Sequence, residues 1–417
     1  MPITRRRWLL LTIASIVNIF IGSVYAWSVF AAPLAEHLSS TTGSVLTAGD
    51  LAIAFSVANG IGPLPMILGG WVTDRFGPRF VMIVGGVLAG AGYVLAGFAT
   101  SLTGLVLGYG VLFGLGLGLV YGCTVNNTLK FFPDHRGLAG GITTTCYGIS
   151  SVIIAPLAAT MIHSVGVTST MVAVGVATGV VAVLGGLFSA KCPENFCPMS
   201  STISMESHEK QREHVVRASS VLSQKEQDWR GMLSSARFWP MMGLLLCGAI
   251  AGMMILSHAH SIGVAVVGLS PAAAASAVAL LAFSNMGGRL VAGFASDHLG
   301  RTTTLAIALG FSIVGLLTLS MSAGSVTVFS IGLIATGLSF GAFMGVFPGF
   351  TAEEFGSRHN AVNYALMFLG FALAGVVGPA LMNAVMQGSG FSNACLTGAA
   401  VAACGFLCIA LFKKTKA

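Results

Sequence analysis

The chain has 417 residues, of which 55% are hydrophobic and only 8% are charged, and its mean hydropathy is +0.88. Soluble domains carry roughly 25% charged residues, so this composition excludes a soluble globular protein. Because one membrane crossing takes about 20 apolar residues, the length accommodates about a dozen spans. The formal net charge of +7 does not indicate a nucleic-acid partner, since the positions of the charges matter more here than their sum.

The apolar segments predict an all-α membrane protein with twelve transmembrane helices. The segments lie near residues 8–35, 47–71, 80–100, 103–129, 138–162, 168–189, 238–264, 272–295, 303–322, 326–350, 361–386 and 392–412. Between the sixth and the seventh lies a polar stretch rich in charged residues. We therefore predict an N-terminal six-helix bundle at 1–189, a linker loop at 190–236 and a C-terminal six-helix bundle at 237–417.

The distribution of basic residues predicts the orientation of the chain. Lys and Arg lie in the N-terminal segment, in the loops after spans 2, 4, 8, 10 and 12, and in the central loop. The opposite loops, which include HLSSTTGS, TSLT and QGSGFSN, contain none. By the positive-inside rule both termini and the central loop are cytoplasmic, and we expect a multi-pass protein of the cell membrane.

The cysteines indicate no disulfide framework. They lie mostly inside apolar segments, where a thiol behaves as a small buried hydrophobe. Cys192 and Cys197 in KCPENFCP could form a metal or redox pair, but no second pair or histidine follows at zinc spacing. We expect no metal and no cofactor. The spans also show no nucleophile and base pair, so we do not expect an enzyme.

The two halves contain a repeat at a constant offset of 223 residues. The segment GWVTDRFG at 70–77 recurs as GFASDHLG at 293–300, and the glycines of GLGLGLVYG at 114–122 recur in GLSFGAFMG at 337–345. Two separate motifs that share one offset indicate a duplicated six-helix unit. In transporters built from such parallel repeats, the substrate site lies between the halves near the membrane midplane.

The segments GGWVTDRFGPRF and GFASDHLGRT resemble the signature loops of the major facilitator superfamily of transporters. The resemblance implies two six-helix halves that rock around a central site. Charge pairing where the cytoplasmic helix ends meet would lock one state of a gate. The alternative is topogenic charge beside a short turn. The candidate gating residues are Asp74, Arg75, Arg79, Asp297 and Arg301.

Arg289 is the only Lys or Arg that the loops do not accommodate. It lies eight residues before Asp297, which places it about 12 Å into the membrane. Intramembrane charges mark substrate or ion paths, and no acidic residue is placed to neutralise this one. The missing partner is therefore expected to be an anionic substrate. The planar guanidinium suits a carboxylate, and Asn285, one turn earlier, can donate a further hydrogen bond. Alternatively, Arg289 ties together carbonyl groups of a broken helix.

Four further segments closely resemble the oxalate/formate antiporter family and, more distantly, the monocarboxylate transporters. They are YAWSVFAAPL, GLGLGLVYGCTVNNTLKFFPDHRGLAGG, SNMGGRLVAGFASDHLGR and RHNAVNYALMFLG. The resemblance covers nearly the whole chain and implies that Arg289 holds a carboxylate. It also implies an aromatic pocket, to which Tyr25, Trp27, Tyr121, Tyr147 and Phe340 would contribute.

One departure from that family bears on the substrate. The oxalate-specific member has a span 11 lysine for the second carboxylate, and counting from Asn363 and Tyr364 places Phe371 at that position. Burying a carboxylate against a benzene ring is unfavourable, so Phe371 favours a monocarboxylate over oxalate. Met344, where the family often has a tyrosine, points the same way.

Uptake of a monoanion against an inside-negative potential is favoured if a proton moves with it. His258 and His260, near the outer end of span 7, are candidates, because histidine titrates nearest physiological pH. On a continuous helix they would lie about 200° apart, so only one could face a cavity. The alternative is that both belong to a polar belt at the membrane interface.

The sequence as a whole predicts a secondary transporter of small monocarboxylates of the lactate and pyruvate type, with proton symport by alternating access. Its partners would be the anion, the proton and the lipid bilayer, with no nucleic acid and no obligate protein partner. The main alternative is carboxylate antiport of the oxalate/formate type. A sensor would need a domain that the central loop does not contain, and a multidrug exporter would more naturally have acidic residues in its spans.

Overall fold

The computed structural model describes residues 3–43, 45–193, 196 and 226–415, and these residues form helices and no strands. The N-terminal helical segments are α1 (Ile3–Ile21), a 3-10 turn η1 (Gly22–Ala26), α2 (Trp27–Thr42), α3 (Ala52–Ile61), α4 (Pro63–Phe76), α5 (Pro78–Gly97), α6 (Leu102–Leu105), a π-helical segment η2 (Val106–Phe113), α7 (Gly114–Phe131) and α8 (Arg136–Phe188). The others are α10 (Trp229–Ser234), α11 (Phe238–Leu256), α12 (Ala259–Ala265), α13 (Pro271–Leu299), α14 (Arg301–Ser320), α15 (Val326–Phe355) and α16 (Asn360–Lys414).

The predicted number of spans is confirmed for the described residues. They contain ten helical stretches that are long and apolar enough to cross a membrane. Two of these, α8 with 53 residues and α16 with 55, are each two helices joined at a glycine. Gly166 has φ 82° and Gly390 has φ 87°, in the left-handed region that glycine adopts without steric cost. The ten stretches therefore hold twelve crossings.

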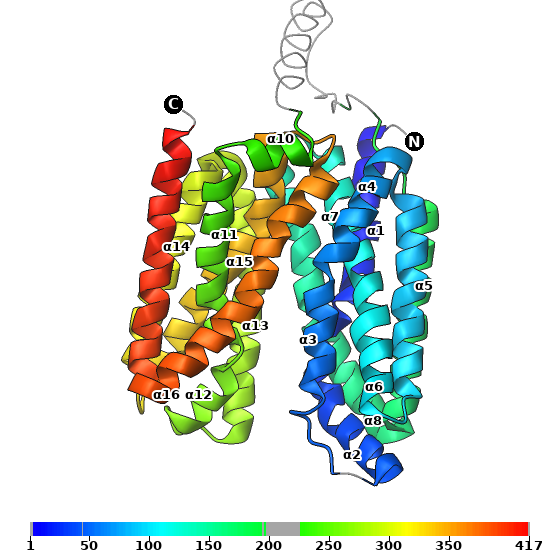
Figure 1. The fold of residues 1–417 in the computed structure, drawn as a ribbon, viewed down its shortest axis with the longest axis vertical. Coiled ribbons are helices and arrows are strands. Elements are labelled where there is room, and N and C mark those ends of the chain that lie inside the picture. The colour runs from blue at the N-terminus through cyan, green and yellow to red at the C-terminus, as the bar shows by residue number, and fades with distance from the viewer. Residues whose placement is uncertain (1–2, 44, 194–195, 197–225, 416–417) are drawn as a thin grey trace, which may run out of the picture.

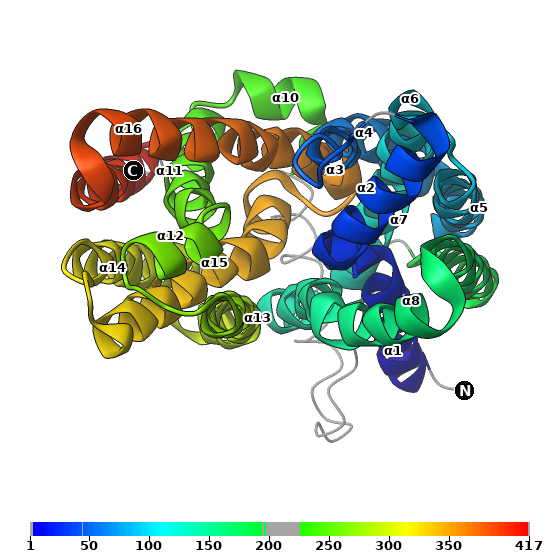
Figure 2. The same cartoon turned by 90° about the horizontal axis from the view of Figure 1, so that it is seen from below.

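Figure 1 shows two helical bundles side by side, with α1–α8 in one and α11–α16 in the other. Both chain termini and α10 lie at the same end of the molecule, which we call the terminal face. The view along the bundles shows α8 beside α13, and α4 beside α16, where the halves meet (Figure 2). The predicted fold of two six-helix halves is confirmed.

The glycine repeat explains how spans 2 and 4 pack together in the first half. A methyl group added at Gly114 would lie 2.9 Å from the Cα of Ala58, and one added at Gly118 would overlap the Gly62 carbonyl. The stripe of small residues thus brings the α7 backbone against α3 and α4.

The same packing recurs in the second half, between α15 and α13. A methyl group at Gly337 would lie 2.8 Å from the Leu281 carbonyl, and one at Gly341 would overlap the carbonyl of Asn285. Leu281 and Asn285 are the residues 223 positions after Ala58 and Gly62. The offset found in the sequence therefore relates both the glycines and the residues against which they pack.

This packing predicts that Gly341→Ala destabilises the protein. The added methyl group has no room against α13, and overpacking of this kind costs about 1–3 kcal/mol. The matched control is Gly375→Ala on α16, where nothing lies within 4 Å of the added methyl group. Thermal unfolding in detergent should show a lower Tm for Gly341→Ala and an unchanged or higher Tm for Gly375→Ala. Equal Tm values for the two variants would contradict the close contact.

Candidate functional site

Arg289 is buried where α13 meets the other half, with only 3% of its surface exposed. Its Nε donates a hydrogen bond to Oδ1 of Asn285 at 2.8 Å, and its Nη1 donates to the Thr144 carbonyl on α8 at 2.7 Å. Within the described residues Nη2 has no hydrogen-bond partner and no carboxylate pairs with the guanidinium. The group is thus a buried cation that links the two halves and lacks a counter-charge.

Glycines on both neighbouring helices create the space for this arginine. Methyl groups at Gly141 of α8 and at Gly345 of α15 would press against the Arg289 backbone. A methyl group at Gly148, one turn after Thr144, would stand 3.7 Å from Cζ of Arg289. Small residues thus bring α13 within hydrogen-bonding reach of the α8 backbone and leave room beside the guanidinium.

A continuous series of aromatic contacts begins in the first half and crosses to the second. The ring centroids of Tyr25 and Tyr147 lie 5.2 Å apart, and those of Tyr147 and Tyr121 lie 4.7 Å apart. Tyr121 then meets Phe368 of α16 at 5.9 Å. These side chains come from η1, α8, α7 and α16, so four separate segments contribute to one cluster.

The series continues within the second half. The ring of Phe368 lies 4.7 Å from that of Phe371, which is stacked 6.1 Å from Phe340 on α15. The structure therefore brings together five residues proposed from the sequence as pocket or substrate contacts: Tyr25, Tyr121, Tyr147, Phe340 and Phe371.

Arg289 lies close to this aromatic cluster, beside several of its tyrosines. Tyr121, Tyr147 and the almost fully buried Tyr364 all lie near its guanidinium. A carboxylate at Arg289 would therefore meet a cation, an amide and phenol groups on one side and aromatic rings on the other.

Phe368, Tyr364, Thr144 and Gly148 were not among the predicted site residues. Phe368 precedes Phe371 by three positions, so helical spacing alone puts both on one face of α16 and could have identified it. Thr144 contributes a backbone carbonyl, which no residue pattern reveals.

Trp27 and Met344 are placed differently from the other predicted pocket residues. Trp27 lies 4.5 Å from Tyr109 and is stacked at 6.5 Å on Phe55, in an aromatic group inside the first half. No ring contact among the described residues joins it to the cluster around Tyr121. Met344 is buried on α15, one turn after Phe340, with 3% of its surface exposed.

The two histidines do not share a continuous helix, so the expected angle between them does not apply. Span 7 breaks after Leu256, and His258 lies in the turn before α12, whereas His260 lies within α12 and is exposed. His258 Nε2 lies 2.7 Å from Oδ1 of Asn383 on α16, and its Nδ1 lies 2.7 Å from Oγ of Ser257. His258 is therefore held by hydrogen bonds between two helices.

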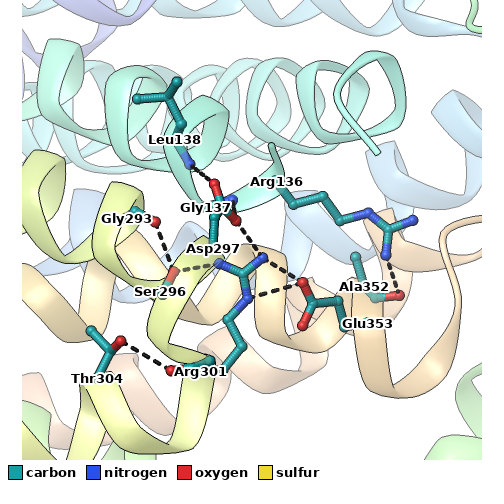
Figure 3. A network of polar contacts seen from close by, with 11 residues as sticks. Arg136, Gly137, Leu138, Gly293, Ser296, Asp297, Arg301, Thr304, Ala352 and Glu353 are labelled. Carbon is teal, nitrogen blue, oxygen red and sulfur yellow. Dashed lines mark hydrogen bonds and ion pairs between the residues drawn. The ribbon is translucent and has the colours of Figure 1, made fainter. Parts of the chain in front are cut away.

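At the terminal face, Asp297 joins the halves through the start of α8 (Figure 3). Its carboxylate accepts hydrogen bonds from the backbone amides of Gly137 at 2.8 Å and Leu138 at 2.9 Å. A carboxylate is favourable there because the first amides of a helix lack partners and carry partial positive charge. Arg301 pairs with Asp297 at 2.8 Å and also with Glu353 of α15.

A related contact lies at the other seam. Asp74 of α4 pairs with Lys130 of α7 at 2.6 Å, and Gly70, one turn earlier on α4, packs against the backbone of Ala361 and Val362 in the first turn of α16. Lys130 also donates to the Arg358 carbonyl at 3.3 Å. Asp297 thus bonds directly to the start of a helix in the opposite half, whereas Asp74 is linked to the opposite half through Lys130.

A buried amide pair strengthens this seam. Nδ2 of Asn360 on α16 donates to Oδ1 of Asn126 on α7 at 2.6 Å, and neither residue is exposed. The sequence analysis did not identify this pair, because its members lie 234 positions apart in segments with no shared motif.

Two predicted gating residues make no contact across the halves in the described part of the chain. The guanidinium of Arg75 lies over the rings of Trp71 and Phe76, at 5.7 and 5.6 Å. Arg79 donates from Nε to the Ser189 carbonyl at 2.8 Å, which lies in the same half. Of the predicted gating residues, Asp297 therefore contacts the other half directly, and Asp74 is linked to it through Lys130.

Comparison with known proteins places this architecture among transporters. An uncharacterised transporter from Escherichia coli, YhjX, is 27% identical over 373 residues, covering 89% of this chain and 86% of that protein. The oxalate:formate antiporter of Oxalobacter formigenes is 26% identical over 392 residues, covering 94% and 87%. Human monocarboxylate transporter 11 is 34% identical over 145 residues, which are 35% of this chain and 30% of that protein.

A solved structure has the same fold. The human organic anion transporter MFSD10 superposes with a TM-score of 0.74 at 13% identity, covering 98% of this chain and all of that one. The model of the Major Facilitator Superfamily matches residues 13–379, with a second match at 266–417. The chain is a multi-pass membrane transporter that belongs to the Major Facilitator Superfamily.

Proposed function

We propose that this protein is a secondary active transporter that carries a small monocarboxylate, of the lactate or pyruvate type, by alternating access with proton symport. The observation that carries the proposal is the buried guanidinium of Arg289, which has no acidic partner among the described residues. A charge inside the membrane is costly unless it is paired or hydrated, and a bound carboxylate would supply the counter-charge.

The hydrogen bonds of Arg289 suggest how binding is linked to movement. Nε and one N–H of Nη1 already have partners, so the second N–H of Nη1 and both N–H groups of Nη2 remain for a carboxylate. The bond to Thr144 connects α13 with α8. A carboxylate that takes the N–H now directed at Thr144 would compete with this link between the halves, whereas Asn285 would keep Nε oriented.

The aromatic cluster favours a substrate with a single carboxylate. Phe371 and Phe368 line one side of the cluster. A second carboxylate on that side would need a cation, and the described residues provide none there. The alternative, carboxylate antiport, is favoured by the similarity to an oxalate:formate antiporter over 94% of the chain. The similarity to monocarboxylate transporters covers about a third of it.

For proton coupling we propose His258, whose contact with Asn383 links α11 and α16. His260 is exposed and makes no side-chain hydrogen bond with the described residues, so it is the weaker candidate. We propose no enzymatic activity.

We further propose that the terminal face is cytoplasmic, as the loop charges indicate, and that its contacts form the inner gate. The carboxylate of Asp297 holds the start of α8, and Lys130, the partner of Asp74, reaches the Arg358 carbonyl of the other half, which supports a closed inner gate. Substrate would then enter from the opposite side of the cell membrane.

Replacing the arginine tests the proposed clamp. Uptake of labelled L-lactate into proteoliposomes with an inward proton gradient should fall at least about 100-fold in Arg289→Gln, because the buried charge that pairs with the anion is lost. Arg289→Lys should retain part of the uptake, since the charge remains without the planar fork. Lys413→Gln, which removes an exposed terminal charge, is the control.

Two outcomes would contradict this proposal. The clamp is wrong if Arg289→Gln transports lactate as the wild type does. Monocarboxylate symport is wrong if the wild type takes up no lactate but exchanges oxalate across preloaded vesicles, and carboxylate antiport then replaces it.

A second substitution tests the role of Phe371 in selectivity. Phe371→Lys places a cation in the aromatic cluster, so inhibition of lactate uptake by oxalate should strengthen by roughly tenfold or more. Phe371→Leu, which changes the packing without adding charge, should not show this gain. If oxalate inhibits the lysine and leucine variants equally while both remain folded, Phe371 does not set the preference.

The proposed inner gate predicts a change in the distance between the halves. Asp297→Asn removes the charge that holds the start of α8 and pairs with Arg301. Spin labels at Phe188 and Leu299, both exposed at helix ends, should show a population at longer distance in a background without cysteines. Asp50→Asn, whose carboxylate bonds only within its own loop around Thr47, should leave the distribution unchanged. An unchanged distribution in Asp297→Asn would contradict the gate.

A further inference from the structure

A pocket separate from the Arg289 site opens at the terminal face, on the seam between α4 and α16. Its volume is about 350 Å³. Seven residues line it: Trp71, Asp74 and Arg75 from α4, Asp228 and Trp229 at the start of α10, and Arg358 and His359 before α16. The pocket thus combines two indole rings with several charged groups.

The two carboxylates of the pocket already have partners. Asp74 pairs with Lys130 at 2.6 Å, and Asp228 accepts a hydrogen bond from the Gly231 amide at 2.9 Å as the cap of α10. Among the described residues neither carboxylate forms an ion pair with Arg75 or Arg358.

The two guanidinium groups, in contrast, have no carboxylate partner among the described residues. Arg75 lies over the rings of Trp71 and Phe76. Arg358 is exposed and is positioned through its backbone, since its amide donates to Glu226 at 2.9 Å and its carbonyl accepts from Lys130 at 3.3 Å. Its side chain is left free to bind an anion. The arrangement suits a phosphate group, which guanidinium groups bind through charge-assisted hydrogen bonds.

The position of the pocket indicates the source of the phosphate. Figure 2 shows α10 projecting past the edge of the bundle beside α16. There it would meet the lipid headgroups of this leaflet. Trp71 is 55% exposed and Trp229 is 44% exposed, as expected of indoles at the boundary between acyl chains and headgroups. A phospholipid can place its phosphate at the arginines and its glycerol and upper acyl chains against these rings.

We propose that this pocket binds the headgroup of an anionic phospholipid. Arg75 belongs to the first half and Arg358 to the second, and both line the pocket, so the two can share one phosphate only while α4 and α16 meet at the terminal face. The lipid would therefore stabilise the closed arrangement of this face, alongside the contacts of Asp74 and Asp297. This proposal does not depend on the identity of the transported solute.

The test compares lipid-dependent stabilisation of purified full-length protein in neutral detergent. Phosphatidylglycerol should raise the Tm of the wild type, whereas phosphatidylcholine should not. The double variant Arg75→Gln, Arg358→Gln should need about tenfold more phosphatidylglycerol for the same shift, because two charge-assisted contacts are lost. The matched control Lys413→Gln, Lys414→Gln removes two exposed positive charges from the same face, away from the pocket, and should respond as the wild type does.

Soluble probes distinguish the lipid from other phosphates. Glycerol phosphate and inorganic phosphate at matched concentration should leave the Tm unchanged, since they lack the acyl chains that contact the indoles. If either soluble anion stabilises the protein as well as phosphatidylglycerol does, the site is one for a soluble anion and the lipid assignment is wrong. If the arginine pair and the lysine pair lose the response equally, general surface charge explains it and the pocket is not the site.

Discussion

The buried charge of Arg289 is the constraint on which the centre of this molecule depends. A guanidinium inside a membrane protein needs hydrogen-bond acceptors, and here Asn285 and the Thr144 carbonyl supply them. The Thr144 carbonyl is within reach only because glycines of α8 and α15 let α13 approach both helices closely. The glycine stripe and the functional site are therefore two aspects of one packing arrangement.

The repeat preserves this packing and changes the chemistry at a few positions. The position related to Arg289 by the 223-residue offset is Met66, which packs beneath Gly122 as Arg289 packs beneath Gly345. Likewise Lys130 corresponds to Glu353, so one signature aspartate pairs with a basic residue and the other is joined to an acidic one through Arg301. The duplicated backbone thus carries a buried cation in only one half, and the contacts at the terminal face differ by the additional carboxylate of Glu353.

Periodicity, loop charge and the repeat predict the helices and the fold, because these follow from local patterns of apolar residues. Arg289 and most of the aromatic cluster were predicted because a lone membrane charge is unusual and a family pattern marks the rings. Phe368 and the Asn126 and Asn360 pair were missed because their roles arise from contacts between distant segments. The break at Ser257 was missed because the apolar run resumes at Ile262 after a short polar stretch and no proline marks the break.

The Thr144 carbonyl and the Arg289 guanidinium differ in what each loses if the hydrogen bond between them breaks. This difference favours replacement of the carbonyl by a substrate carboxylate. Thr144 lies inside α8, where its carbonyl also accepts the helical hydrogen bond from the amide of Gly148, so losing Nη1 does not leave it unsatisfied. The guanidinium, however, always needs an acceptor. A carboxylate can therefore replace the Thr144 carbonyl, neutralise the charge and remove one link between the halves in a single exchange. A monoanion leaves the centre neutral, whereas a dianion would leave one negative charge facing Phe368 and Phe371, where no cation lies among the described residues of the cluster.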